Sequence, residues 1–232
     1  MNDKANTKPT EKIVNSESTP SGKSASCGCS GNPVFEGLDR RYKFALWLVI
    51  VINAAMFLIE MTAGKISGSQ ALQADALDFL ADASTYGMSL AVIGMSLKVR
   101  SIAALVKGLS LLFMGLWVFS ATAYQVLVLG VPNAGVMGAV GALALAANLT
   151  SVLILMRYRN GDANVRSVWL CSRNDAIGNV AVMVASVVVG LTASAWPDLI
   201  VAFVMAGLFL RSSQLILSQA WNEYRNGTVV AA

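Results

Sequence analysis

Long apolar runs separated by short polar segments make up the chain from about residue 40 onward. A run of about 20 apolar residues is long enough to cross a bilayer as a helix. Six such runs are predicted, at about 44–63, 71–97, 105–129, 134–156, 167–192 and from the turn at Trp196-Pro197-Asp198 to 218. The pattern therefore predicts an all-α membrane protein with six transmembrane helices, and we expect Asp198 to cap the sixth.

The segment before the first run is of a different kind. Residues 1–38 are rich in Ser, Thr, Asn, Lys and Gly, which is typical of a disordered tail. The tail contains Cys27 and Cys29, which could capture a soft metal but supply only two of the usual four ligands, or could be incidental. We expect a transmembrane domain over residues 39–219, followed by a short tail over 220–232.

Composition and charge placement agree with a membrane protein. Hydrophobic residues make up 56% of the chain and charged residues 13%, an apolar excess beyond that of a soluble domain. The net charge of +4 comes from basic residues in short segments near the ends of the spans, so it indicates orientation rather than a nucleic-acid partner. Most of them fall at the start of the chain, around residues 98–107 and 157–166, and at the end, which predicts that both termini are cytoplasmic.

The second run carries three carboxylates. Asp75, Asp78 and Asp82 fall within about 60° of one another on a helix, so they share one face. An ionised side chain in the middle of a membrane costs roughly 2.5–3.5 kcal/mol. The negative charge of three ionised carboxylates must be compensated, which a bound cation or protons would do. The chain has no histidine, so carboxylates, amides or thiols must do this chemistry.

The fifth run repeats the spacing of the second. Asp175 and Asn179 are four residues apart, as Asp78 and Asp82 are, so facing helices could surround one cation with four oxygen-bearing side chains. Neighbouring carboxylates cannot all ionise cheaply without the metal, so we expect protons to replace it during a transport cycle. Asp175 could instead pair with Arg173, with Asn179 as a packing amide. Other polar candidates near these positions are Asp75, Glu60, Asn53, Asn148 and Cys171.

The ordered set of polar residues resembles the cation diffusion facilitator family. The matching residues are Asn53, Glu60, Gly64, Ser67, Ala74-Asp75-Ala76, Asp78, Asp82, Asn148-Leu149, Asp175, Asn179 and Asp198. The resemblance covers roughly residues 40–218. It implies six helices, usually a homodimer, and export of Zn²⁺ or a related divalent ion against protons. In this chain, membrane helices or the tail would have to hold such a dimer. We expect a multi-pass protein of the cell (inner) membrane and no further cofactor.

Two departures from that family affect the expectations. The family commonly has His at one or more ligand positions, whereas this chain has Asp and Asn, which suits harder ions such as Mn²⁺ and leaves Zn²⁺, Fe²⁺, Co²⁺ and Cd²⁺ open. Members usually carry a cytoplasmic domain after the sixth span, and the chain is expected to be a short member without it.

Two other classes of protein compete with a transporter. Lipid-linked phosphotransferases also place clustered Asp residues on a membrane helix, but Phe79 stands where their pattern has Gly, and no Ala-Arg follows. A membrane metal sensor that does not transport would fit the missing domain and the Cys27–Cys29 pair. A sensor has no need of acidic pairs on two spans, so an exporter is the preferred hypothesis.

Overall fold

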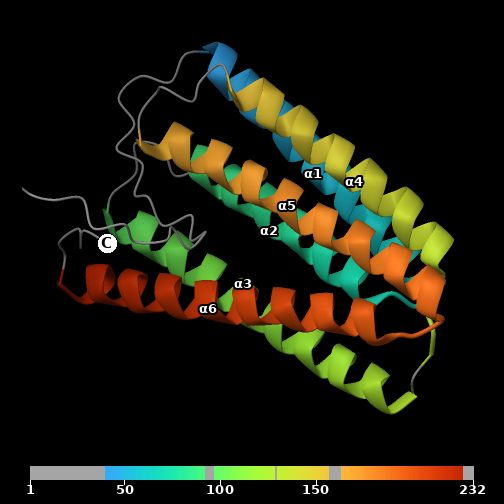
Figure 1. Cartoon of the computed structure of the whole chain (residues 1–232). Coiled ribbons are helices and arrows are strands. Elements are labelled where there is room, and N and C mark those ends of the chain that lie inside the picture. Colours follow the sequence, from blue (N-terminus) through green and yellow to red (C-terminus); the bar gives the residue numbers. More distant parts are fainter. Residues whose placement is uncertain (1–39, 92–96, 129, 157–162, 227–232) are drawn as a thin grey trace, which may run out of the picture.

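The structure is a computed structural model that describes residues 40–91, 97–128, 130–156 and 163–226. This part of the chain forms six α-helices and no strands, which confirms the predicted fold class (Figure 1). The helices are α1 (Arg40–Ser67), α2 (Gln70–Ala91), α3 (Leu97–Val128), α4 (Ala134–Met156), α5 (Ala163–Thr192) and α6 (Trp196–Asn226). The expected tail at residues 1–38, with Cys27 and Cys29, lies outside the described residues.

Several helices extend beyond the apolar runs that predicted them. α3 begins at Leu97 rather than near residue 105, so Lys107 lies well inside the helix instead of in a connecting segment. α6 continues to Asn226, into the stretch expected as a tail. A change from apolar to polar residues marks where a helix leaves the bilayer, but it does not stop the backbone hydrogen bonding that defines the helix.

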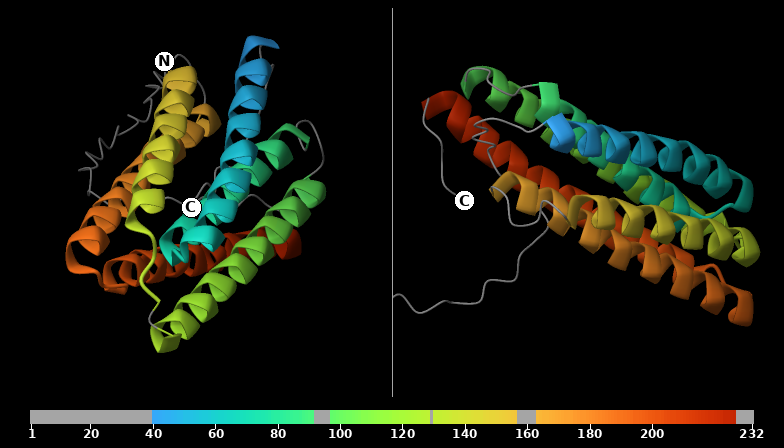
Figure 2. Two further views of the ribbon diagram at one scale, coloured as in Figure 1. Left: turned by 90° about the vertical axis from the view of Figure 1, so that its right-hand side faces the viewer. Right: turned by 90° about the horizontal axis from the view of Figure 1, so that it is seen from above.

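The six helices form three layers of two, with α2 and α5 in the middle (Figure 1). α1 and α4 lie on one side of this pair, and α3 and α6 lie along each other on the opposite side, which the further views also show (Figure 2). α2 packs against α1, α3, α5 and α6. The helix with the most carboxylates is therefore surrounded by protein.

The apolar face of the middle layer is closely packed. One cluster joins Ala74 and Leu77 of α2 to Leu111 of α3 and Phe209 of α6, and a second joins Leu72 of α2 to residues of α4 and α5. Large exposed apolar side chains lie on α1, α3, α4, α5 and α6, as in a protein surrounded by lipid. Packing therefore stabilises the interior of the bundle, and the apolar outer surface suits contact with lipid chains.

Five of the six helices are long and apolar enough to cross a membrane, judged by length and composition over the described residues. The helix that does not qualify is α2, the one that carries Asp75, Asp78 and Asp82. Five such helices in one bundle confirm the prediction of an integral, multi-pass membrane protein.

The basic side chains gather at one end of the bundle. α1, α3 and α5 begin at the end where α2, α4 and α6 finish (Figure 1). Arg40, Arg41, Lys98 and Arg225 lie at this end, and Lys65 lies at the opposite end in the last turn of α1. By the positive-inside rule this asymmetry is expected if the basic end is cytoplasmic, and the orientation stays a prediction.

The turn between α1 and α2 is held by a residue from α6. Asp198 accepts hydrogen bonds from the backbone N–H groups of Gln70 (2.8 Å) and Ala71 (3.1 Å) and from the hydroxyl of Ser69. Asp198 therefore caps α2 and not α6, which corrects the expectation. The prediction was wrong because Asp198 already lies within the first turn of α6, where its side chain can reach a neighbouring helix.

Candidate metal site

The middle layer brings the two predicted pairs together. Asp78 and Asp82 lie one turn apart on α2, and both are half-buried. α5 runs antiparallel to α2, and its Asp175 lies within hydrogen-bonding reach of both carboxyl groups. Three carboxyl groups from two helices thus converge inside the bundle, where the α2–α5 contact is made.

Asn179 completes the set on the next turn of α5. Its side chain is fully buried, and neither its oxygen nor its nitrogen has a hydrogen-bond partner among the described residues. A buried amide without partners is costly, whereas a cation would use the amide oxygen. The chemistry of the set, three carboxylates and an amide, fits a divalent cation that accepts oxygen ligands.

The four residues do not form a closed coordination shell. No three His, Cys, Asp or Glu side chains within the described ranges have the geometry of a metal centre. The carboxyl groups of Asp78, Asp82 and Asp175 are neighbours, but they do not have the arrangement of ligands around one ion.

Tyr86 is a contact of the site that the sequence interpretation missed. Its hydroxyl donates a hydrogen bond of 2.8 Å to Oδ2 of Asp82, one turn further along α2, and its side chain is fully buried. This bond fixes the orientation of the Asp82 carboxylate, in the way that outer hydrogen bonds orient metal ligands. The spacing of four residues between Asp82 and Tyr86 was the available signal.

Lys107 of α3 is a second missed residue. Its side chain is half-buried, and its positive charge acts on the Asp82 carboxylate. It was counted among the basic residues of a connecting segment because the apolar run alone placed the start of the third span near residue 105. The signal that could have revealed it was that one helix can continue from Leu97 into that run, which places Lys107 inside the helix.

Glu60 and Asp75 form a separate acidic pair nearer the end where α1 meets α2. Glu60 is fully buried and Asp75 nearly so, at 2% exposure, and their carboxyl groups are close enough across the two helices for their charges to interact. Asp75 is also close enough to Asp78 for their charges to interact. The pair is therefore continuous with the candidate ion site.

The remaining accessory candidates are placed less directly. Asn53 is buried, and its amide donates to the backbone oxygen of Val49 in its own helix at 2.8 Å, so it is already paired within α1. Asn148 is buried on α4, a helix that packs on α1 and α5. Cys171 falls in α5, but its side chain lies outside the described residues, as does the Arg173 pairing considered above.

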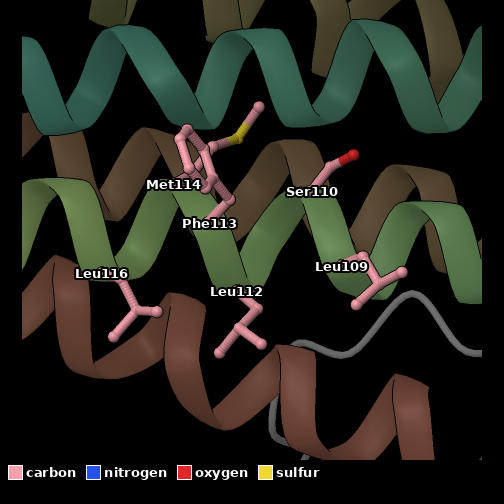
Figure 3. Close-up of a pocket in the computed structure, with 6 residues that line it drawn as sticks. All are labelled: Leu109, Ser110, Leu112, Phe113, Met114 and Leu116. Carbon is pink, nitrogen blue, oxygen red and sulfur yellow. The ribbon is translucent and has the colours of Figure 1, made fainter.

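A surface cavity on α3 is unrelated to these acids. It measures about 560 Å³, and the described residues that line it belong to α3: Leu109, Ser110, Leu112, Phe113, Met114 and Leu116 (Figure 3). Leu112 and Leu116 point toward the neighbouring helix in this view. None of these described lining residues is charged, so they offer no carboxylate for a cation.

Comparison with known proteins agrees with this arrangement. The profile of the cation efflux transmembrane domain matches residues 46–221, which include all four residues of the candidate site. The chain is similar to the zinc transporter ZitB of Escherichia coli (strain K12) and to that of Shigella flexneri, with 25% identity over 193 residues in each case. The match covers 78% of this chain and 62% of the relatives, so the chain spans less than two thirds of their length. The matched domain contains all six helices, and the chain therefore belongs to the cation efflux family.

Proposed function

We propose that the protein is a secondary transporter that exports a divalent metal cation from the cytoplasm in exchange for protons. Asp78, Asp82, Asp175 and Asn179 hold the transported ion. The observation that carries the proposal is the convergence of Asp175 on both Asp78 and Asp82 in the centre of a bundle of the cation efflux family. The family supports transport rather than lipid chemistry, which had been the competing enzymatic hypothesis.

The physical argument for transport rests on the cost of buried charge. Three carboxylates between membrane helices are retained only where a cation offsets them, and residues of this kind mark ion pathways. A metal ion binds the deprotonated carboxylates, so its binding releases protons and its departure is favoured when protons return. If the site opens to one side of the membrane at a time, this exchange couples outward metal movement to inward proton movement.

The ligand set and the relatives both bear on which ion is transported. ZitB is named a zinc transporter, which favours Zn²⁺. The four candidate ligands all supply oxygen, which favours Mn²⁺ more than a site with imidazole would, and Fe²⁺, Co²⁺ and Cd²⁺ complete the range to be tested. A homodimer through membrane helices and a location in the inner membrane complete the proposal.

The test is metal uptake into inside-out vesicles. Uptake of Zn²⁺, Mn²⁺, Co²⁺, Fe²⁺ and Cd²⁺ is measured separately with an imposed proton gradient, for the natural sequence, for Asp82→Ala and for Ser84→Ala. Ser84 is an exposed residue of the same helix and serves as the matched control. We expect gradient-dependent uptake of at least one ion, abolished in Asp82→Ala and retained in Ser84→Ala.

Two outcomes would contradict the proposal. Uptake by folded Asp82→Ala at the rate of the natural sequence would remove Asp82 from the site. Absence of uptake for all five ions, with folded protein in the vesicles, would reject the exporter and return attention to a metal sensor, for which metal binding without transport is the expected result.

A further inference from the structure

Lys107 occupies a position that the proposed transport cycle does not explain. It lies ten residues after the start of α3 at Leu97, and Asp82 lies nine residues before the end of α2 at Ala91. At about 1.5 Å per residue, both are roughly 14–15 Å from the same end of the bundle. Since α2 and α3 are antiparallel neighbours (Figure 1), this count places the backbone of Lys107 and that of Asp82 at a similar depth in the bundle.

The face of α3 that carries Lys107 is directed into the bundle. Leu111, Met114 and Val118 follow Lys107 at helical spacing, and all three join the cluster that contains Ala74 and Leu77 of α2. Lys107 thus continues an inward-facing row rather than an outward one. Its charge acts on Asp82 in the described structure, which agrees with this direction.

Burying a lysine at this depth costs free energy unless an opposite charge compensates its ammonium group. Amphipathic lysines near helix ends extend their ammonium group to the interface, but a side chain on an inward-facing row has the acidic cluster as its counter-charge. Asp82 therefore interacts with three side chains: the Tyr86 hydroxyl, the Asp175 carboxyl and the Lys107 ammonium.

We propose that Lys107 is the fixed counter-charge of the ion site and sets its affinity for the metal. This inference rests on the proposed function. Three ionised carboxylates and one ammonium carry a net charge of −2, which one divalent cation neutralises. The positive charge of Lys107 opposes binding of the cation, so it limits affinity and speeds release. When the metal has left, Lys107 keeps part of the carboxylate charge compensated.

The experiment measures metal binding by the purified full-length protein in detergent, by calorimetry with Zn²⁺ and with the ion transported best. We compare the natural sequence with Lys107→Gln, Lys107→Met and Lys107→Arg. Lys65→Gln is the control, because Lys65 is an exposed lysine at the opposite end of the bundle. The melting temperature of each variant is recorded with and without metal, which gives a readout that does not depend on transport.

We expect Lys107→Gln and Lys107→Met to bind the metal about tenfold more tightly, a difference of about 1.4 kcal/mol. Both should melt at lower temperature without metal and gain more stability when metal is added, because the uncompensated carboxylates then depend on the ion. Transport at saturating metal should slow because release slows. Lys107→Arg should restore natural affinity, and Lys65→Gln should behave as the natural sequence.

Unchanged or weaker metal affinity in folded Lys107→Gln and Lys107→Met would overturn the inference. Loss of folding in both, with Lys107→Arg folded and unchanged in affinity, would do so as well, because it would assign Lys107 to folding rather than to affinity. Asp78→Ala separates this inference from the proposed function. If Asp78→Ala binds metal as tightly as the natural sequence, the proposed ion site is wrong. If Asp78→Ala loses metal affinity while Lys107→Gln and Lys107→Met keep the natural affinity, the ion site is retained and only the role of Lys107 is rejected.

Discussion

At the scale of single residues, the site contains polar groups that are costly to bury. Asn179 has both polar atoms buried without a hydrogen bond among the described residues, and Asp78 lies close to the like charges of Asp82 and Asp75. Such contacts lower stability unless a ligand compensates them. Asp82 is different, because the Tyr86 hydroxyl donates to its Oδ2 at 2.8 Å and the Lys107 charge acts on its carboxylate.

The Tyr86 hydrogen bond leads to a prediction about affinity. Tyr86→Phe removes the donor but keeps the buried ring, so the fold should be retained. We expect metal affinity to fall by about tenfold, since loss of a partner that orients a metal ligand costs this much or more. Calorimetry on the purified protein measures it. Tyr124→Phe is the control, because Tyr124 is 66% exposed on α3; an equal loss there, or none in Tyr86→Phe, would contradict the prediction.

Sequence spacing predicted the residues of the candidate site that share a helix face, but not the ones that reach it from elsewhere. Asp78, Asp82, Asp175 and Asn179 follow from helical periodicity, because carboxylates and amides in an apolar run are conspicuous. Lys107 was not predicted, since its side-chain direction depends on where α3 begins. Tyr86 was overlooked because an aromatic residue in an apolar helix is ordinary until its hydroxyl is seen to meet an acid.

At the scale of the elements, α2 is held in position at its N-terminal end by another helix. Asp198 of α6 accepts hydrogen bonds from two backbone N–H groups in the first turn of α2 and from the hydroxyl of Ser69. The Ser69 hydroxyl in turn accepts a hydrogen bond of 3.0 Å from the backbone N–H of Leu72. The order of helices and their approximate spans were predictable from hydropathy. This junction was not, because its partners are 127–129 residues apart in sequence.

Removal of the Asp198 carboxylate should therefore destabilise the bundle at α2. We expect Asp198→Ala to cost about 1–2 kcal/mol, the loss of a helix cap. For a chain of this size that lowers the melting temperature by about 2–8 °C, measured in detergent. Ser194→Ala is the matched control, since the Ser194 hydroxyl accepts only a long, exposed bond of 3.4 Å from Trp196. An Asp198→Ala melting temperature equal to that of the control would show that the junction adds no stability.

At the scale of the whole molecule, the helices differ in what they expose. Large apolar side chains are exposed on α1, α3, α4, α5 and α6, whereas α2 in the middle layer carries three aspartates and exposes no such side chain among its described residues. The sequence predicted the number of helices and the uneven charge of the two ends. It could not predict which helices occupy the middle layer, because that depends on packing between runs of similar hydropathy.

The charge asymmetry predicts the orientation of the bundle. In a background where Cys27, Cys29 and Cys171 are replaced by Ser, single cysteines are introduced by Lys65→Cys and Lys98→Cys, both at exposed positions. A membrane-impermeant maleimide should label Lys65→Cys in intact cells and Lys98→Cys only after permeabilisation. The reverse pattern would place the basic end outside and would reverse the direction of transport as well.

The three aspartates of α2 have a consequence for how the protein enters the membrane during synthesis. Over the described residues, five helices are long and apolar enough to cross a membrane by themselves, and α2 does not meet this criterion. α1 and α2 are joined by a two-residue turn and pack along each other, with Gly64 so close to Gln73 that an added Cβ would lie 2.8 Å from its side chain. α2 is therefore expected to leave the translocon as a hairpin with α1, so the carboxylates proposed to hold an ion also make the biogenesis of this helix dependent on its neighbour.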